Sequence, residues 1–135
     1  MFNWSEARAV PVEDARLDID ERELIQANWI LGAVNCVVTG SSDRDRKQVQ
    51  LTWEFAQGFY VSGPESNNLG ELKLGIFPTR NLAWKIENSP WVKQWAEAEP
   101  VFETWKNETN HWALFTEQAS VHLIAVSAPV IMEHV

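Results

Sequence analysis

The chain has 135 residues, of which 45% are hydrophobic and 22% charged, a composition typical of one folded domain and not of a disordered chain. Its single cysteine, Cys36, excludes an internal disulfide and any zinc site built from cysteine pairs. The formal net charge of −8 argues against nucleic-acid binding, which needs clustered Lys and Arg; the one net-positive stretch, residues 41–47, mixes three bases with two aspartates.

The first 28 residues are predicted to form an N-terminal arm, followed by a single α+β domain over residues 29–135. Within the arm, Pro11, the acidic residues and a weak apolar spacing define no regular period. Asp20 followed by Glu23 is typical of a capping box, which favours one or two helical turns over residues 21–27. The alternative is an extended segment laid against the domain.

From Trp29 onward the pattern changes to that of β-strands. The clearest case is residues 48–55, where every second residue is apolar and predicts a half-buried strand: Val49, Leu51, Trp53 and Phe55. Four more strands, separated by turn-forming residues, are predicted over residues 29–39, 59–61, 71–76 and 82–87.

A helix is predicted after these strands. Ser89 is a good N-cap, and Pro90 suits the first helical position, where a missing N–H costs nothing. Pro100 interrupts the helix, so we expect one kinked helix or two short helices meeting near Glu99. The apolar residues of this segment share one helical face: Trp91, Trp95, Ala98, Phe102 and Trp105.

Residues 111–117 and 120–127 predict a C-terminal β-hairpin that turns at residues 118–119. Residues 121–126 are apolar on both faces, as in an inner strand, and residues 130–132 predict a last edge strand. Strands are grouped rather than alternating with helices. The predicted fold class is therefore α+β: an antiparallel β-meander of five or more strands packed against the helical segment, followed by the hairpin.

The histidines lack the spacing of a metal site. With the hairpin turning at residues 118–119, Phe115 pairs with His122 and His111 faces Val126. The two imidazoles then lie on the same side of the sheet but too far apart to share a metal ion. We therefore expect no metal and no cofactor.

No catalytic motif is recognisable: the sequence has neither a G-x-S-x-G elbow nor a glycine-rich phosphate loop. Cys36 lies mid-strand between valines, where a buried and unreactive thiol is expected. The best candidate for acid–base chemistry is His111 beside Glu108 and Glu117.

Tryptophan is the unusual feature of the composition, with eight in the chain. One interpretation is an aromatic core built from the strands and the helical face. The other is a pocket between helix and sheet, lined by Trp53, Trp84, Trp91 and Trp95.

The leading functional hypothesis is a small acidic, non-enzymatic binding protein of inhibitor or immunity type. It would meet a basic partner protein through acids that flank the aromatic residues, namely Glu97, Glu99, Glu103 and Glu108. The alternative is a small-ligand-binding domain that uses the tryptophan-lined pocket, with catalysis left open. A homo-oligomer formed through the edge strand at residues 130–132 is a third hypothesis. With no secretory signal and no apolar run of about 20 residues, the protein is expected to be cytoplasmic and not to bind membranes.

Overall fold

The computed structural model describes residues 4–12, 20–42, 45–62, 83–98, 108–116 and 119–134. Within these ranges the chain forms nine strands and one helix. In chain order they are β1 (Arg8–Pro11), β2 (Asp20–Ile30), β3 (Ala33–Ser42), β4 (Asp45–Trp53), β5 (Ala56–Ser62), β6 (Ala83–Glu87), α2 (Pro90–Ala98), β7 (Asn110–Phe115), β8 (Ser120–Ala125) and β9 (Val130–His134).

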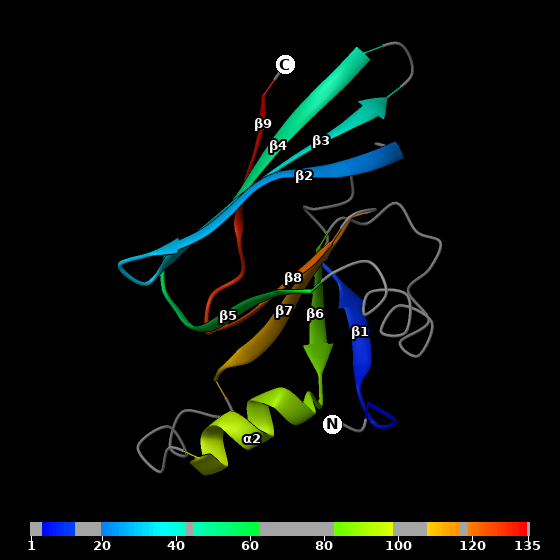
Figure 1. Cartoon of the computed structure of the whole chain (residues 1–135). Coiled ribbons are helices and arrows are strands. Elements are labelled where there is room, and N and C mark those ends of the chain that lie inside the picture. The colour runs from blue at the N-terminus through cyan, green and yellow to red at the C-terminus, as the bar shows by residue number, and fades with distance from the viewer. Residues whose placement is uncertain are drawn as a thin grey trace.

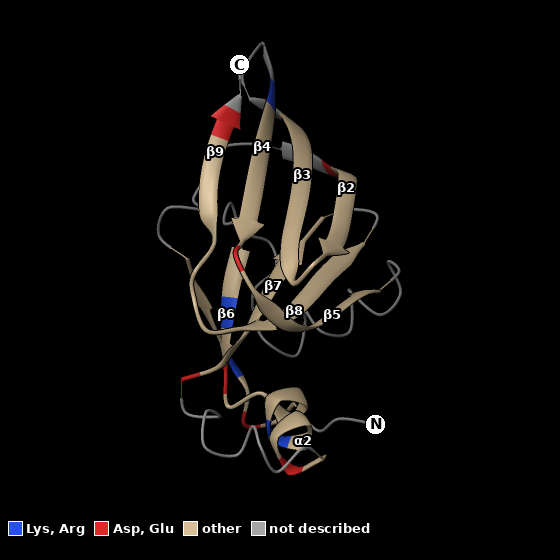
Figure 2. Cartoon of the chain, turned by 90° about the vertical axis from the view of Figure 1, so that its left-hand side faces the viewer, with Lys and Arg blue, Asp and Glu red and all other residues tan. Residues whose placement is uncertain are grey.

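The strands form two antiparallel sheets. One has the order β1-β6-β7-β8-β5 and the other the order β2-β3-β4-β9. The four-stranded sheet lies at one end of the molecule, and α2 lies at the opposite end, beside the five-stranded sheet (Figures 1 and 2). The predicted α+β fold, with mainly antiparallel strands and one helical segment, is confirmed, and its strands are divided between two sheets.

Apolar side chains of both sheets form a core between them, which we call the inter-sheet core. The four-stranded sheet contributes Val34, Cys36, Val38, Val49, Leu51 and Trp53, and the five-stranded sheet contributes Ala56, Ala83, Trp112, Leu114, Val121, Leu123 and Ala125. Every second residue of a strand points to the same face, so the alternation in the sequence translates directly into this layer. Trp53 is fully buried here.

The opposite face of the five-stranded sheet carries a separate apolar group, which we call the outer cluster. It consists of Trp84, Ile86, Ala113 and Phe115, with Trp4, Ala7 and Ala9 packed against it. Since Trp53 belongs to the inter-sheet core, Trp53 and Trp84 do not meet. The predicted burial of both is confirmed, but they lie in different layers.

The N-terminal segments are strands. Residues 20–30 form β2 and pair with β3, so the helical turns expected over residues 21–27 are wrong and the extended alternative holds. The pairing of β2 with β3 has register shifts between Asp20 and Glu23 and between Leu24 and Gln26. Residues 8–11 pair with β6.

The strand predicted over residues 29–39 in fact contains a turn. Leu31 and Gly32 both have positive φ and connect β2 to β3. A two-residue hairpin turn of this kind interrupts an apolar run without any polar residue to mark it. Phe55 also departs from the prediction: β4 ends at Trp53, and the Phe55 side chain is 61% exposed.

The helix begins as predicted. Ser89 Oγ accepts a hydrogen bond from the Val92 N–H at 3.4 Å, and the Ser89 carbonyl accepts one from the Lys93 N–H at 3.2 Å. Pro90 is the first helical residue and Ala98 the last. The kink expected near Glu99 and the strand expected over residues 71–76 lie outside the described residues.

The C-terminal strands also follow the prediction in outline. All six residues of β8 are buried, as expected of an inner strand, and β8 lies between β7 and β5. β9 is an edge strand, paired with β4. No helix in the described part of the chain is long and apolar enough to cross a membrane.

Candidate functional site

The hairpin of β7 and β8 brings the two histidines together. Its strands pair Phe115 with Ser120, Ala113 with His122 and His111 with Ile124. The turn therefore begins one residue earlier than predicted, which moves the register by two residues. The prediction that the imidazoles lie on one side of the sheet is confirmed, but the prediction that they lie far apart is wrong.

His111 and His122 form the centre of a hydrogen-bonded chain of four side chains. Ser89 Oγ lies 2.8 Å from His111 Nδ1, His111 Nε2 lies 2.8 Å from His122 Nδ1, and His122 Nε2 lies 2.9 Å from Ser120 Oγ. All four residues are buried. We call this set the Ser–His–His–Ser chain.

Two directions of hydrogen bonding satisfy all four side chains, and they differ in the ring nitrogen that carries the proton of each imidazole. In the first direction Ser89 Oγ accepts the Val92 N–H and donates its own proton to His111 Nδ1. His111 then carries its proton on Nε2 and donates to His122 Nδ1, and His122 donates from Nε2 to Ser120 Oγ. Both rings are neutral in this arrangement, and all four ring nitrogens have a partner.

Aromatic rings enclose the two imidazoles. Tyr60 of β5 stacks on His122 with the ring centroids 4.6 Å apart and an interplanar angle of 11°. Trp91 of α2 meets His111 edge-on at 5.2 Å, and Trp4 lies 5.6 Å from the same ring. The first turn of α2 is thereby fixed against the outer face of the five-stranded sheet.

This environment keeps both imidazoles uncharged. Burial lowers the pKa of His111 well below its ordinary value of 6.5, and repulsion from His122 lowers it further. Burial lowers the pKa of His122 to about 4. Burial also raises the pKa of the neighbouring Tyr60 hydroxyl to about 12, so this ring is neutral as well.

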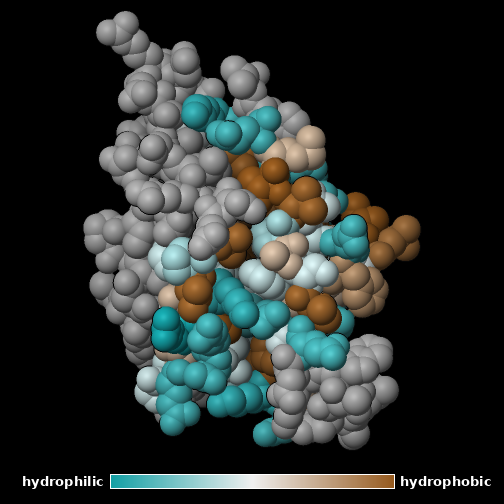
Figure 3. Space-filling model, turned by 180° about the vertical axis from the view of Figure 1, so that it is seen from behind, coloured by the Kyte–Doolittle hydropathy of each residue, from teal (hydrophilic) through white to brown (hydrophobic). Residues whose placement is uncertain are grey.

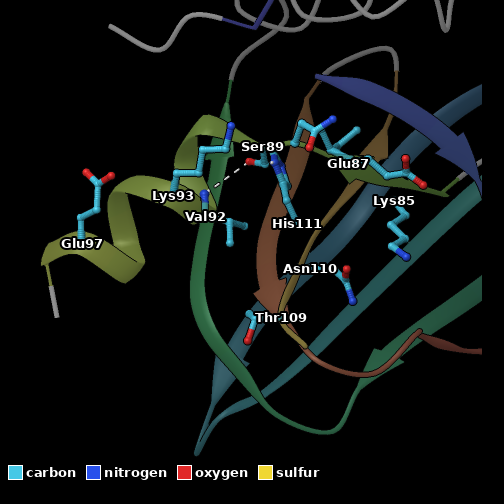
Figure 4. A pocket seen from close by; sticks show the side chains of 11 residues that line it. Lys85, Glu87, Ser89, Val92, Lys93, Glu97, Thr109, Asn110 and His111 are labelled. Carbon is cyan, nitrogen blue, oxygen red and sulfur yellow. Dashed lines mark hydrogen bonds between the residues drawn. The ribbon is translucent and has the colours of Figure 1, made fainter. Parts of the chain in front are cut away.

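One end of the Ser–His–His–Ser chain opens into a pocket of about 530 Å³. The pocket is lined by the end of β6, one face of α2 and the start of β7, and Ser89, Val92 and His111 converge where the helix begins (Figure 4). Its buried lining residues, which we call the floor, are Ile86, Ser89, Val92, Thr109 and His111. Its exposed charged residues, the rim, are Glu87, Lys93 and Glu97.

The four tryptophans expected to line a pocket lie elsewhere. Trp53 is buried in the inter-sheet core and Trp84 in the outer cluster. Trp91 and Trp95 are half-buried on α2, and Trp91 contacts Tyr60 and His111. None of the four is among the lining residues of the pocket beside Ser89.

The four predicted partner-binding acids are only partly described. Glu97 is exposed and belongs to the pocket rim, and Glu108 is exposed just before β7. Glu99 and Glu103 lie outside the described residues, as does Glu117, the predicted acid–base partner of His111. Cys36 is fully buried, and burial raises the pKa of its thiol to about 12, as expected of an unreactive cysteine.

Sequence reasoning found the members of the site but not their association. It assigned Ser89 a capping role, which the structure confirms, and it singled out His111, but with acidic partners instead of Ser89 and His122. The alternation of side chains along β7 and β8 could have associated the two histidines, because His111 and His122 lie on the same face of the sheet in either register. Among the described residues no group of His, Cys, Asp and Glu could hold a metal ion.

Comparison with known proteins adds no further information about this site, because no family model, no curated protein and no solved structure matches the chain.

Proposed function

We propose that the chain is a small-ligand-binding domain whose site is the pocket between α2 and the β6–β7 edge. The observation that carries this proposal is the coincidence of a pocket of about 530 Å³ with three buried polar side chains, Ser89, Thr109 and His111, in its floor. A volume of this size suits a small organic ligand, and the polar groups that converge in the lining can orient it.

The floor indicates the kind of ligand. It offers two hydroxyls and an imidazole beside apolar Ile86 and Val92. The charged lining residues lie outside the floor: Lys85 is half-buried, and Glu87, Lys93 and Glu97 are at the exposed rim. A charged group at the floor would lose its hydration, and no floor residue carries a countercharge. The ligand is therefore a small neutral molecule with hydrogen-bonding oxygens and a short apolar portion.

Blocking the rim tests this function. Lys93 is exposed, so the new thiol in Lys93→Cys is accessible. Cys36 is buried, and burial raises the pKa of its thiol. A bulky maleimide will therefore modify position 93 selectively. We expect neutral short-chain esters and amides to raise the unfolding temperature of the unmodified protein more than the matching carboxylates do. The modification should weaken this binding at least tenfold.

The control is Lys47→Cys with the same maleimide, since Lys47 lies in the four-stranded sheet and is ion-paired with Glu133 at 3.7 Å. It should leave binding unchanged. Equal loss of binding in both modified variants, or no stabilisation by any neutral compound, would contradict the proposed site.

A second candidate is the acidic binding function expected from the sequence. Exposure of Glu97 and Glu108 favours it, since both carboxylates are available to a basic partner. Because salt screens exposed carboxylates, this function differs from the pocket function in its dependence on ionic strength.

A further inference from the structure

We propose that Ser89 is a nucleophile for acyl transfer, with His111 as its general base and His122 as a positioning residue for His111. This inference rests on the proposed ligand pocket and assigns it a substrate class, small carboxylic esters. A nucleophilic serine is identified by a base within hydrogen-bonding reach and a third group that orients the base. The distances of 2.8 Å from Ser89 Oγ to His111 Nδ1 and 2.8 Å from His111 Nε2 to His122 Nδ1 meet both conditions.

The placement of the Ser–His–His–Ser chain distinguishes it from a polar network that only fills the core. Its two ends are chemically alike, but Ser89 and His111 line the pocket, whereas Ser120 and His122 do not. Ser89 also caps α2, and it is the serine of this network whose hydroxyl lies beside the cavity. The reacting end is therefore Ser89.

The helix contributes to the same site. Ser89 is the N-cap of α2, so the positive end of the helix dipole lies beside the hydroxyl, and the Lys93 ammonium is at the rim. Both favour negative charge on a carbonyl oxygen that is attacked at this point. Before the attack the ester is uncharged, and the uncharged floor of the pocket suits it.

The reaction balances with water as the only co-reactant. Ser89 Oγ forms a bond to the ester carbonyl carbon while its proton passes to His111 Nδ1. The bond to the alcohol oxygen then breaks, and the alcohol leaves with that proton. Water attacks the acyl-serine, gives a proton to His111, and the acid departs as Ser89 recovers its proton; ester and water become acid and alcohol.

His122 supports the charged intermediate state. When His111 gains a proton on Nδ1, it can pass its Nε2 proton to His122 Nδ1, which moves the positive charge one ring away from the pocket. The stacked face of Tyr60, 4.6 Å from the His122 ring, favours a cation there. Because burial opposes charge on both rings, we expect turnover of activated esters only, such as p-nitrophenyl acetate.

The experiment is covalent labelling of the full chain with an alkyl fluorophosphonate, followed by intact mass and peptide mapping. The expected adduct is on Ser89. Ser89→Asn removes the nucleophile but keeps a good helix cap, and His111→Gln removes the base; each should slow labelling and p-nitrophenyl acetate hydrolysis about 100-fold or more. Thr52→Val, which removes a half-buried hydroxyl in the four-stranded sheet, is the control and should change both rates less than threefold.

The pH profile tests the role of His122. The labelling rate should rise through a midpoint below pH 6.5 and then stay level, because neutral His111 is the active form. His122→Gln removes the repulsion from the second ring and should move the midpoint upward, which a purely structural role would not do. No Ser89 adduct, or an adduct rate equal in Ser89→Asn and wild type, would overturn the proposal. If neutral esters and amides still stabilise Ser89→Asn, the pocket function survives; if they stabilise no form of the protein, both proposals fail.

Discussion

A buried neutral imidazole has one donor and one acceptor, and both need partners. His111 and His122 satisfy each other on one side, and Ser89 and Ser120 satisfy them on the other. The hydrogen-bonding groups of both imidazoles are therefore satisfied without any charged residue. Its weakness is that each member depends on its neighbour, so removing one ring leaves polar atoms unpaired on both sides.

At this scale we predict strong coupling between the two histidines. His122→Leu leaves His111 Nε2 and Ser120 Oγ without their partner and should lower the free energy of unfolding by about 2 kcal/mol or more, measured by urea denaturation. His111→Leu/His122→Leu should cost less than the sum of the single variants by at least about 0.5 kcal/mol. Strictly additive costs would contradict a connected chain.

The matched comparison is the half-buried hydrogen bond from Thr52 Oγ1 to Asn35 Oδ1, 2.9 Å long, in the other sheet. Thr52→Val should cost only about 1 kcal/mol, because solvent can satisfy the remaining amide.

The site shows what sequence reasoning can and cannot reach at the level of residues. The N-cap at Ser89 was predictable, since it depends on neighbours three residues away. The contact between His111 and His122 was not, because it depends on where one turn begins, and a change of one residue in the turn moves every cross-strand pair by two.

At the scale of elements, the turn between β2 and β3 places an apolar residue in the left-handed conformation. Leu31 has φ 51° and Gly32 has φ 87°, the conformation of a turn that prefers Asn-Gly. Leu31 is 99% exposed, and hydrophobic side chains protrude at this edge of the molecule (Figure 3). Gly32 suits this turn because residues with a side chain rarely adopt φ 87°, and a Cβ there would lie 2.6 Å from Phe55 Cδ2 unless the phenyl ring moved.

We therefore predict that Leu31→Asn stabilises the protein. A left-handed conformation costs a branched apolar residue about 1 kcal/mol, whereas Asn adopts it readily. The exposed leucine gives up no packing when it is replaced. The free energy of unfolding should rise by about 1 kcal/mol in urea denaturation, and Leu31→Val, with a β-branched side chain, should lower it; the opposite order would show that the leucine makes a stabilising contact.

The same turn explains why strand boundaries were harder to predict than strand existence. The inner faces of β3 and β4 follow the alternation of Val34, Cys36, Val38, Val49 and Leu51, and all five are fully buried. The division of the strands between two sheets produces no pattern in the sequence, because it depends on pairing between β4 and β9, which are far apart in sequence.

At the scale of the whole molecule, the five-stranded sheet separates two environments. Its inner face belongs to the inter-sheet core, which is built from apolar and aromatic side chains, and its outer face carries the Ser–His–His–Ser chain and the pocket. The core can therefore hold the fold together while the outer face keeps polar groups that a uniform core would exclude. The cost of this arrangement is sensitivity to acid.

The last prediction concerns that sensitivity. In the folded protein the pKa of His122 is about 4 because of burial, whereas the unfolded chain has the ordinary value of 6.5. Between these values only the unfolded state binds the proton, so the free energy of unfolding should fall as pH falls, by about 1.4 kcal/mol per pH unit and about 3 kcal/mol in all. The lowered pKa of His111 acts in the same direction, and neither group contributes a slope above pH 6.5. Urea denaturation across this pH range should show that the free energy of unfolding depends less steeply on pH in His111→Leu/His122→Leu than in the wild type. The double variant keeps the carboxylates but lacks both imidazoles. Equal slopes in the two proteins would mean that the imidazoles are not held neutral by burial.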